Sequence, residues 1–417
     1  MNKSLQSLFL ILLPFYALIA WAYHFVTDKP LDMAVNILLL PVAGYFLVQG
    51  KVRVPKYLVC FIIFTIYHLA STLFFKTMPE GENPIYSVLS DINLFACTLL
   101  IIIENMTFSE EFIHKMYRNL FIVVVLTLIV SVIQIKFPTF MFNEKLLEGE
   151  ELDFWGEEIR NNAFYSYVNT NSLGISFPIF VAILLNYYDT QKKYFALIIL
   201  SGIVVAFLTK TRYVMLSTII AFSQLFFAQK RSMSKRLSLV LTFAVSIVII
   251  VFIANEAGFN IDEVIANRIL EKGNDMESAK ARVTSYEVFM IKFPEHPWLG
   301  VGPKTRPDVV ALLNGEAPLI HVGYLSYLYF YGVVGCFFIF LSFFFLLKDA
   351  WSVGKRYNFW GSFYGFVSFL VANVTFVYFN MAEMGMIIAV LYLRFYNQPE
   401  ELVVEDEEHT PQLVTGK

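Results

Sequence analysis

Long apolar blocks recur along almost the whole chain, and they restrict its fold more than any other feature of the sequence. Most of them approach the roughly 20 residues that a helix needs to cross the hydrocarbon core of a bilayer. Only helices and closed barrels satisfy the backbone in lipid, and barrel strands would show alternating rather than continuous apolar residues. The sequence therefore predicts an all-α, polytopic membrane protein with about 12 transmembrane helices.

The composition agrees with this prediction and excludes several other classes. Hydrophobic residues make up 57% of the 417 residues, charged residues only 16%, and the mean hydropathy is +0.61. A soluble domain of this size needs a more charged exterior. The net charge of −3 and the lack of a basic stripe argue against a nucleic-acid partner. The three cysteines, Cys60, Cys97 and Cys336, lie inside apolar blocks and are predicted to be packing residues.

Twelve spans are predicted, and two of them, 194–208 and 381–396, are short enough to begin earlier or to be partly re-entrant. The spans are 5–25, 31–48, 57–75, 88–103, 120–135, 168–188, 194–208, 213–228, 237–254, 322–347, 359–378 and 381–396. Basic residues concentrate in short loops such as 51–56 and 230–236, and the positive-inside rule then places both termini in the cytoplasm.

This topology divides the chain into four parts. Residues 1–254 hold the first nine helices, 255–321 form a large external loop, 322–396 hold the last three helices, and 397–417 form an acidic cytoplasmic tail. A second, acidic external loop covers 137–167. Within the large loop, residues 275–293 are predicted to form an amphipathic helix, with Arg282 and Glu287 off its apolar face. That face comprises Val283, Tyr286, Phe289, Met290 and Phe293.

A few residues break these patterns and are candidates for function. Lys210 and Arg212 fall in a turn on the external side, where they either snorkel to lipid phosphates or line the outer mouth of the bundle. Gly300 and Gly302 lie in a tight loop that permits close backbone approach or is simply a surface loop. His321 stands at the outer end of the next span, where a structural role and a catalytic role both remain open.

Further along that span, helical spacing places Tyr324 on the same face as His321. Tyr324 is either a member of an outer aromatic belt or a substrate contact. Gly332 and Gly335 are predicted to allow close helix packing further down.

An ordered set of short motifs over roughly residues 169–343 resembles the bacterial O-antigen ligase and O-antigen polymerase superfamily. The motifs are Asn169-Thr170-Asn171, Thr209-Lys210-Thr211-Arg212, Ala281-Arg282-Val283, Pro297-Trp298-Leu299-Gly300-Val301-Gly302, and His321 followed by Tyr324, Leu325, Leu328, Gly332 and Gly335. The resemblance implies a membrane glycosyltransferase that acts on polyprenyl-diphosphate-linked oligosaccharides at the outer face of the bacterial cytoplasmic membrane, without a metal ion or other cofactor.

The resemblance also implies roles for particular residues. Arg212, Arg282 and His321 correspond to the catalytic residues, and the substrate-binding candidates are Lys210, Asn171, Tyr324, Gly300 and Gly302. Two guanidinium groups suit a diphosphate leaving group because each binds phosphate oxygens in a two-bond fork. A histidine can remove the proton of an acceptor hydroxyl as the hydroxyl attacks the sugar with inversion, or it can only orient the substrates.

The implied partners are a polyprenyl-diphosphate-linked oligosaccharide, a glycan acceptor, membrane lipids, a flippase and a chain-length regulator, with no nucleic acid. A polymerase and a ligase differ only in the acceptor. The polymerase is favoured because Val322 stands where the family often has Asn. A polysaccharide transporter or flippase is a more distant alternative, since its ionisable residues should lie near the bilayer midplane.

Overall fold

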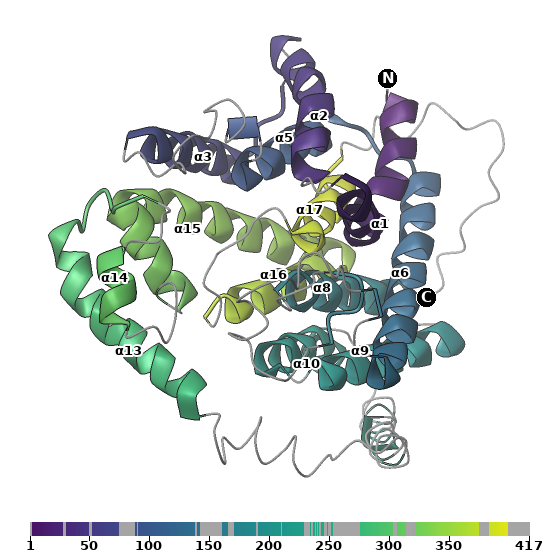
Figure 1. The fold of residues 1–417 in the computed structure, drawn as a ribbon. Helices are drawn as coiled ribbons and strands as arrows, with labels where there is room; N and C mark the ends of the chain where they lie inside the picture. Colours follow the sequence, from purple (N-terminus) through teal and green to yellow (C-terminus); the bar gives the residue numbers. More distant parts are fainter. Residues whose placement is uncertain are drawn as a thin grey trace.

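A computed structural model describes most of the chain, and every regular element in the described residues is a helix (Figure 1). The described residues are 2–27, 31–49, 52–74, 88–89, 91–137, 140–141, 161–165, 171–188, 191–209, 211–228, nine single positions between 234 and 252, 276–302, 307–313, 320, 322–374 and 383–398. The all-α prediction is therefore confirmed for this part of the chain.

Most helices follow the predicted spans, because continuous apolar runs fix where a membrane helix forms, but α6 begins ten residues before its span and α15 ends ten residues after its span. They are α1 (Asn2–Thr27), α2 (Leu31–Val48), α3 (Lys56–Phe74), α5 (Ile92–Asn105), α6 (Glu110–Lys136), α8 (Asn171–Tyr187), α9 (Lys192–Leu208), α10 (Arg212–Phe227), α13 (Met276–Lys292), the short 3-10 helix η3 (Phe293–Glu295), α14 (Pro307–Leu312), α15 (Gly323–Tyr357), α16 (Gly361–Ala372) and α17 (Met384–Tyr396). Most of the predicted span 237–254 lies outside the described residues.

By length and composition, four described helices can cross a membrane: α1, α3, α6 and α15. The other apolar helices have 12–18 residues. The count of 12 spans and the placement of the termini stay predictions. The three cysteines are buried and form no disulfide, which confirms their predicted packing role.

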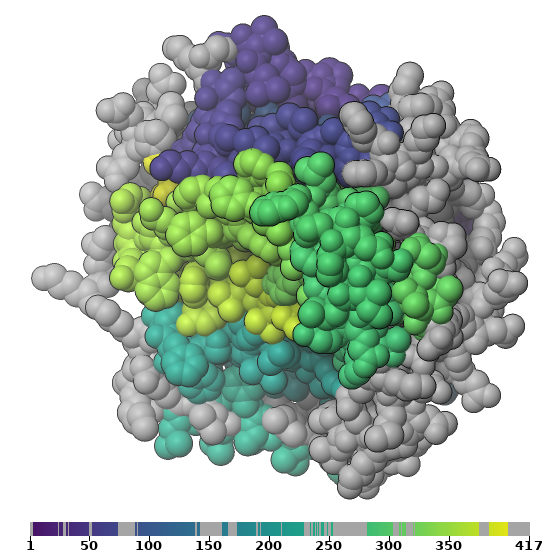
Figure 2. Space-filling model, turned by 90° about the vertical axis from the view of Figure 1, so that its left-hand side faces the viewer, coloured from purple at the N-terminus to yellow at the C-terminus, as the bar shows by residue number. Residues whose placement is uncertain are grey.

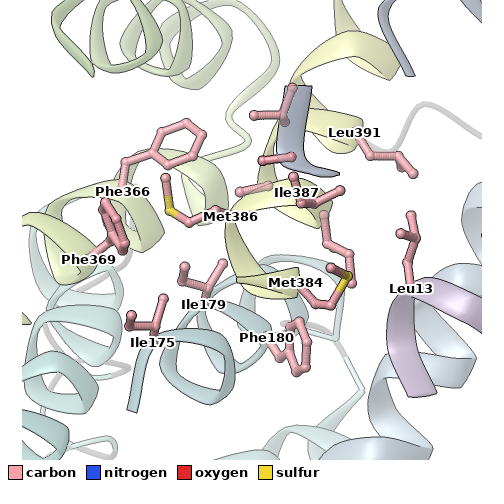
Figure 3. Close-up of a cluster of buried hydrophobic side chains, with 14 of the residues drawn as sticks. Leu13, Ile175, Ile179, Phe180, Phe366, Phe369, Met384, Met386, Ile387 and Leu391 are labelled. Atoms are coloured by element: carbon pink, nitrogen blue, oxygen red, sulfur yellow. The ribbon is translucent and has the colours of Figure 1, made fainter. Parts of the chain in front are cut away.

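Two helices at the centre of the bundle bury nearly all of their side chains. The side chains of α8 from Leu173 to Leu185 are buried, and so are those of α17 from Met384 to Arg394. A helix that is apolar all round is enclosed by others. Figure 3 shows the apolar cluster in which Ile179 and Phe180 of α8 meet residues of α16, α17 and α1.

Glycines let these central helices approach closely. A Cβ on Gly361 of α16 would lie 2.8 Å from the Cα of Ile183 in α8, and one on Gly385 of α17 would lie 2.6 Å from the Cα of Ser176. Such small-residue contacts are typical of helices packed in membranes. Both α16 and α17 are thereby fixed along α8. In Figure 1, α2, α3 and α5 lie together above this centre, and α9 and α10 lie below it.

Helix α13 confirms the predicted helix over 275–293, but its buried side agrees with the predicted apolar face only at Phe289. Val283, Tyr286 and Met290 are 54–59% exposed, whereas Ser285, Val288 and Phe289 are buried. Apolar residues occur on more than one side of this helix, and packing against α14 and α15 selects the side that carries small Ser285. Figure 2 shows α13 and α14 on the surface next to α15.

Candidate functional site

Arg212 opens α10 directly after a tight turn. α9 ends at Leu208, and Thr209 and Thr211 are buried on either side of Lys210, which lies outside the described residues. The Thr211 hydroxyl donates to the Thr209 carbonyl at 2.8 Å, and this bond holds the turn closed. Arg212 is half-buried at the first turn of α10, where the sequence predicted it.

The start of α8 lies beside the start of α10. A Cβ on Gly174 would meet the Tyr213 ring at 2.3 Å, so this glycine makes room for the residue next to Arg212. Asn171 is the first residue of α8, and its side chain lies outside the described part. The sequence motifs that contain Asn171 and Arg212 thus occupy neighbouring helix starts.

The start of α17 joins the same end of the bundle. The Ser176 hydroxyl of α8 accepts a hydrogen bond from the Gly385 amide at 3.1 Å and lies 3.5 Å from an oxygen of Glu383. Glu383 is the N-cap residue of α17 and is only 9% exposed. The start of α8 therefore lies beside the start of α10 and beside that of α17, and a helix start carries a positive partial charge.

The beginning of α15 contacts α16, which also contacts α10. Tyr324 donates its hydroxyl to the carbonyl of Leu370 in α16. Two residues earlier along α16, the Ser368 hydroxyl donates to the carbonyl of Ser217 in α10 at 3.1 Å. The last turns of α16 therefore contact the first turns of both α10 and α15.

His321 itself lies outside the described residues, but the positions on either side of it are described. Ile320 is buried, and Val322 is the N-cap residue of α15. The buried hydroxyl of Ser326 donates to the carbonyls of both Ile320 and Val322. These bonds anchor the two neighbours of His321 to the first turn of α15.

The helix α15 is broken at Gly332, which corrects the prediction that Gly332 only allows close helix packing. Gly332 has φ 59° and ψ −172°, a conformation essentially restricted to glycine. The rings of Tyr324 and Phe340 are 5.8 Å apart although these residues are 16 positions apart, which is about 24 Å along a straight helix. The two halves of α15 therefore fold toward each other at the break.

Residues 297–302, called the glycine loop below, fill this break. Val333 and Val334 donate their amides to the carbonyls of Pro297 and Trp298 at 2.9 and 3.1 Å. In the other direction, Val301 donates to Tyr329 at 3.2 Å. Gly302 likewise donates to Phe330 at 2.9 Å. Four backbone hydrogen bonds thus satisfy groups that the helix break exposes.

Gly300 and Gly332 face each other at the centre of this pairing. A Cβ on Gly300 would lie 2.3 Å from the Phe330 carbonyl oxygen, and one on Gly332 would lie 2.3 Å from that of Trp298. Gly300 and Gly302 also have φ of 69° and 83°. The predicted close backbone approach is therefore present, and the approaching backbone is the chain's own.

Arg282 lies on the inward face of α13. It is half-buried, its Nε is buried, and it shares a face with the buried residues Ser285 and Phe289. At the other end of α13, Lys292 forms ion pairs with Asp308 and Glu295 at 3.0 and 3.2 Å. The hydrogen bonds of these carboxylates raise the pKa of Lys292.

Comparison with known families connects these features. Residues 195–341 match the family Wzy_C, described as O-antigen ligase. This match supports the resemblance to the O-antigen ligase/polymerase superfamily. A comparison with curated proteins finds no match for the chain.

The O-antigen ligase domain contains most of the predicted site residues. It takes in Arg212, Arg282, both loop glycines and the position of His321, and it ends in the second half of α15. The structure joins the glycine loop to α15. It also places the start of α8 beside that of α10, and the last turns of α16 contact both α10 and the start of α15.

Several residues beside the O-antigen ligase domain were missed by the sequence reasoning. Glu383 stands at the edge of the predicted span 381–396, where nothing distinguishes it from an ordinary helix cap. His68 is different, because an ionisable residue inside an apolar block is by itself a signal of function. Asp91 precedes an apolar run, which is a helix-start signal.

Proposed function

We propose that this multi-pass membrane protein is a glycosyltransferase that polymerises polyprenyl-diphosphate-linked oligosaccharide repeats at the outer face of the cytoplasmic membrane. The match of residues 195–341 to the O-antigen ligase family supports the reaction class. The observation that carries the proposal is the position of Arg212 at the start of α10, directly beside the start of α8.

This arrangement suits a phosphate-containing donor. Helix starts present unpaired amides and a positive potential, and phosphate groups bind at such ends. The Arg212 guanidinium adds a permanent charge and a planar pair of donors. Arg282, on the inward face of α13, supplies the second guanidinium. Together they stabilise the negative charge that grows on the lipid diphosphate in the transition state.

The proposed reaction exchanges one bond to the sugar for another. The acceptor hydroxyl oxygen attacks C1 of the donor sugar, and the bond from C1 to the phosphate oxygen breaks. The electron pair of that bond leaves with the polyprenyl diphosphate, and His321 takes the hydroxyl proton. Attack from the face opposite the leaving group inverts the anomeric centre.

Lys210 and Asn171 are proposed to assist donor binding. Lys210 lies two positions before Arg212 in the sequence, and Asn171 begins the neighbouring helix α8. Tyr324 is proposed to contact the substrate with its ring, since its hydroxyl already donates to the carbonyl of Leu370. Gly300 and Gly302 serve the site indirectly, by seating the loop in the α15 break.

A ligase is the second candidate function, because the matching family is described as O-antigen ligase. The two activities differ in what a deletion strain accumulates. Loss of a polymerase leaves single lipid-linked repeats, whereas loss of a ligase leaves long lipid-linked chains that are not attached to the final acceptor. Normal attached polymer in the deletion strain would reject both functions. Complementation with the intact chain provides the control.

A further inference from the structure

A buried chain of hydrogen bonds runs from α5 through α3 to the break in α15. His68 of α3 lies 2.5 Å from Asp91 through Nε2 and 2.8 Å from the Tyr331 hydroxyl through Nδ1. His68 and Tyr331 are 7% and 3% exposed. Tyr331 is the residue directly before Gly332.

With an ionised Asp91 and a neutral His68, one arrangement of protons satisfies this chain. The other oxygen of that carboxylate accepts from the amides of Asn93 and Leu94, so Asp91 caps α5 as well. An ionised carboxylate only accepts hydrogen bonds, and Nε2 of His68 must then carry the proton. Nδ1 is left as an acceptor, and the Tyr331 hydroxyl donates to it. The imidazole orientation is therefore fixed from both sides.

The neighbouring residue of α3 contacts both partners of the break. The Tyr67 hydroxyl lies 2.6 Å from the carbonyl oxygen of Leu299 in the glycine loop and 3.1 Å from that of Tyr331 in α15. A Cβ on Gly335 would meet the Tyr67 ring at 2.7 Å, so this ring lies against the second half of α15 as well. One side chain thus joins the loop to both halves of the broken helix.

We infer that Tyr67 and His68 are positioning residues for glycosyl transfer, which hold the broken helix and the glycine loop in one geometry. This inference rests on the proposed function. The segment from Gly323 to Tyr331 begins two residues after His321, and its far end is the end that Tyr67 and His68 hold. Neither residue touches the substrates.

The expected effect follows from the length of that segment. It is about 13 Å long at 1.5 Å per residue, so a tilt of about 5° at Tyr331 moves the other end by about 1 Å. A misplacement of about 1 Å at a reacting group can reduce the rate about 10²-fold. Loss of the Tyr67 hydroxyl should therefore lower kcat by about 10- to 100-fold with little change in the KM for the lipid-linked donor.

The test uses the full chain in detergent or membranes with a cysteine pair as a direct report of loop position. The pair is Trp298→Cys with Val333→Cys, because both native side chains are exposed and the backbones run side by side, with Val333 donating to Pro297 and Val334 to Trp298. We expect rapid cross-linking in the otherwise native chain. The rate should fall strongly when Tyr67→Phe is added, and turnover should fall with it.

Two further variants make the test independent of misfolding. Tyr331→Phe removes the donor to His68 and should reproduce the effect of Tyr67→Phe. Tyr57→Phe is the matched control, because it removes a buried hydroxyl from the same helix α3 at the opposite end, where Tyr57 donates to Glu104 at 2.7 Å. It should leave cross-linking and kcat unchanged. Closing the disulfide in the Tyr67→Phe protein should restore at least part of the lost turnover.

Unchanged cross-linking in both Tyr67→Phe and Tyr331→Phe overturns the inference. So does normal turnover in variants whose cross-linking is lost, or an equal loss of turnover in Tyr57→Phe. If the otherwise native protein transfers no sugar from any lipid-linked donor, the proposed function fails. The cross-linking rates still decide whether Tyr67 and Tyr331 hold the loop.

Discussion

Replacement of Gly332 by alanine should destabilise the protein at the α15 break. The added Cβ would lie 2.3 Å from the carbonyl oxygen of Trp298 and 2.6 Å from the amide nitrogen of Gly300. Both are backbone atoms and cannot rotate away. The backbone angles at Gly332 also strain any residue that has a Cβ. Conformational strain and overpacking together cost about 2–6 kcal/mol.

The chain can relieve this strain only by moving the glycine loop out of the break. That movement gives up the four backbone hydrogen bonds donated by Val301, Gly302, Val333 and Val334. We therefore expect a lower melting temperature for purified Gly332→Ala in detergent, together with slow cross-linking between loop and helix. Gly300→Ala should have the same effect, because a Cβ on Gly300 would likewise meet backbone atoms, those of Phe330 and Gly332.

Two comparisons make the result decisive. Gly44→Ala in α2 is the matched control, since no described atom lies within 4 Å of its added Cβ. Alanine there should be neutral or stabilising by up to about 1 kcal/mol. The double variant of Gly300 and Gly332 should lose less than the sum of the single losses, because either change already displaces the loop. A melting temperature of Gly332→Ala equal to that of the Gly44→Ala control would refute this reasoning.

Three further predictions concern the proposed chemistry and topology. Arg212→Lys and Arg282→Lys should each remove nearly all polymer from gels at normal protein level, because an ammonium group cannot form the two-bond fork. Near-native polymer in both variants excludes the proposed phosphate clamp, in which the two guanidinium groups bind the diphosphate. His321→Gln should bind the lipid-linked donor but turn over about 10²- to 10⁴-fold more slowly, and robust turnover leaves only a positioning role. A cysteine at Lys304 should react with an impermeant thiol reagent in intact cells and one at Ser234 should not; the opposite result places the site in the cytoplasm.

Matched controls for the substitutions exist elsewhere in the chain. Arg118 is an exposed arginine of α6, and Arg118→Lys should leave polymer unchanged. His114 is an exposed histidine of the same helix whose Nδ1 lies 2.7 Å from the Tyr187 hydroxyl. His114→Gln should keep normal turnover. A loss of activity in either control would show that the assay responds to general damage.

Helix positions could be predicted from the sequence because a membrane span is a local property. The bounds of α2 agree with the predicted span at both ends, and α9 and α10 differ from theirs by at most two residues. The buried face of α13 could not be predicted in the same way. Its apolar residues surround the helix, so the choice between Val283 and Val288 depends on what lies next to it.

The helix break could not be predicted because a glycine in an apolar block can either allow close helix packing or break the helix. Gly335 allows close packing, as expected, since it admits the Tyr67 ring against a helix that stays regular. Gly332 instead breaks the helix, and it can do so only because the carbonyls of residues 297–298 accept hydrogen bonds from the amides that the break frees. The contacts of His68 have the same origin, because its partners are 23 and 263 positions away in the sequence.

The break also explains why the glycine loop and α15 should act as one unit. Irregular backbone at membrane depth is tolerated where other protein groups satisfy it, and the glycine loop supplies those groups to α15. The loop follows α13, which carries Arg282, and the first half of α15 follows His321. Because the same four hydrogen bonds fix both segments, a change that frees the loop must alter the proposed phosphate clamp and the proposed base together. Variants at the break should therefore lose more turnover than variants that affect either group alone.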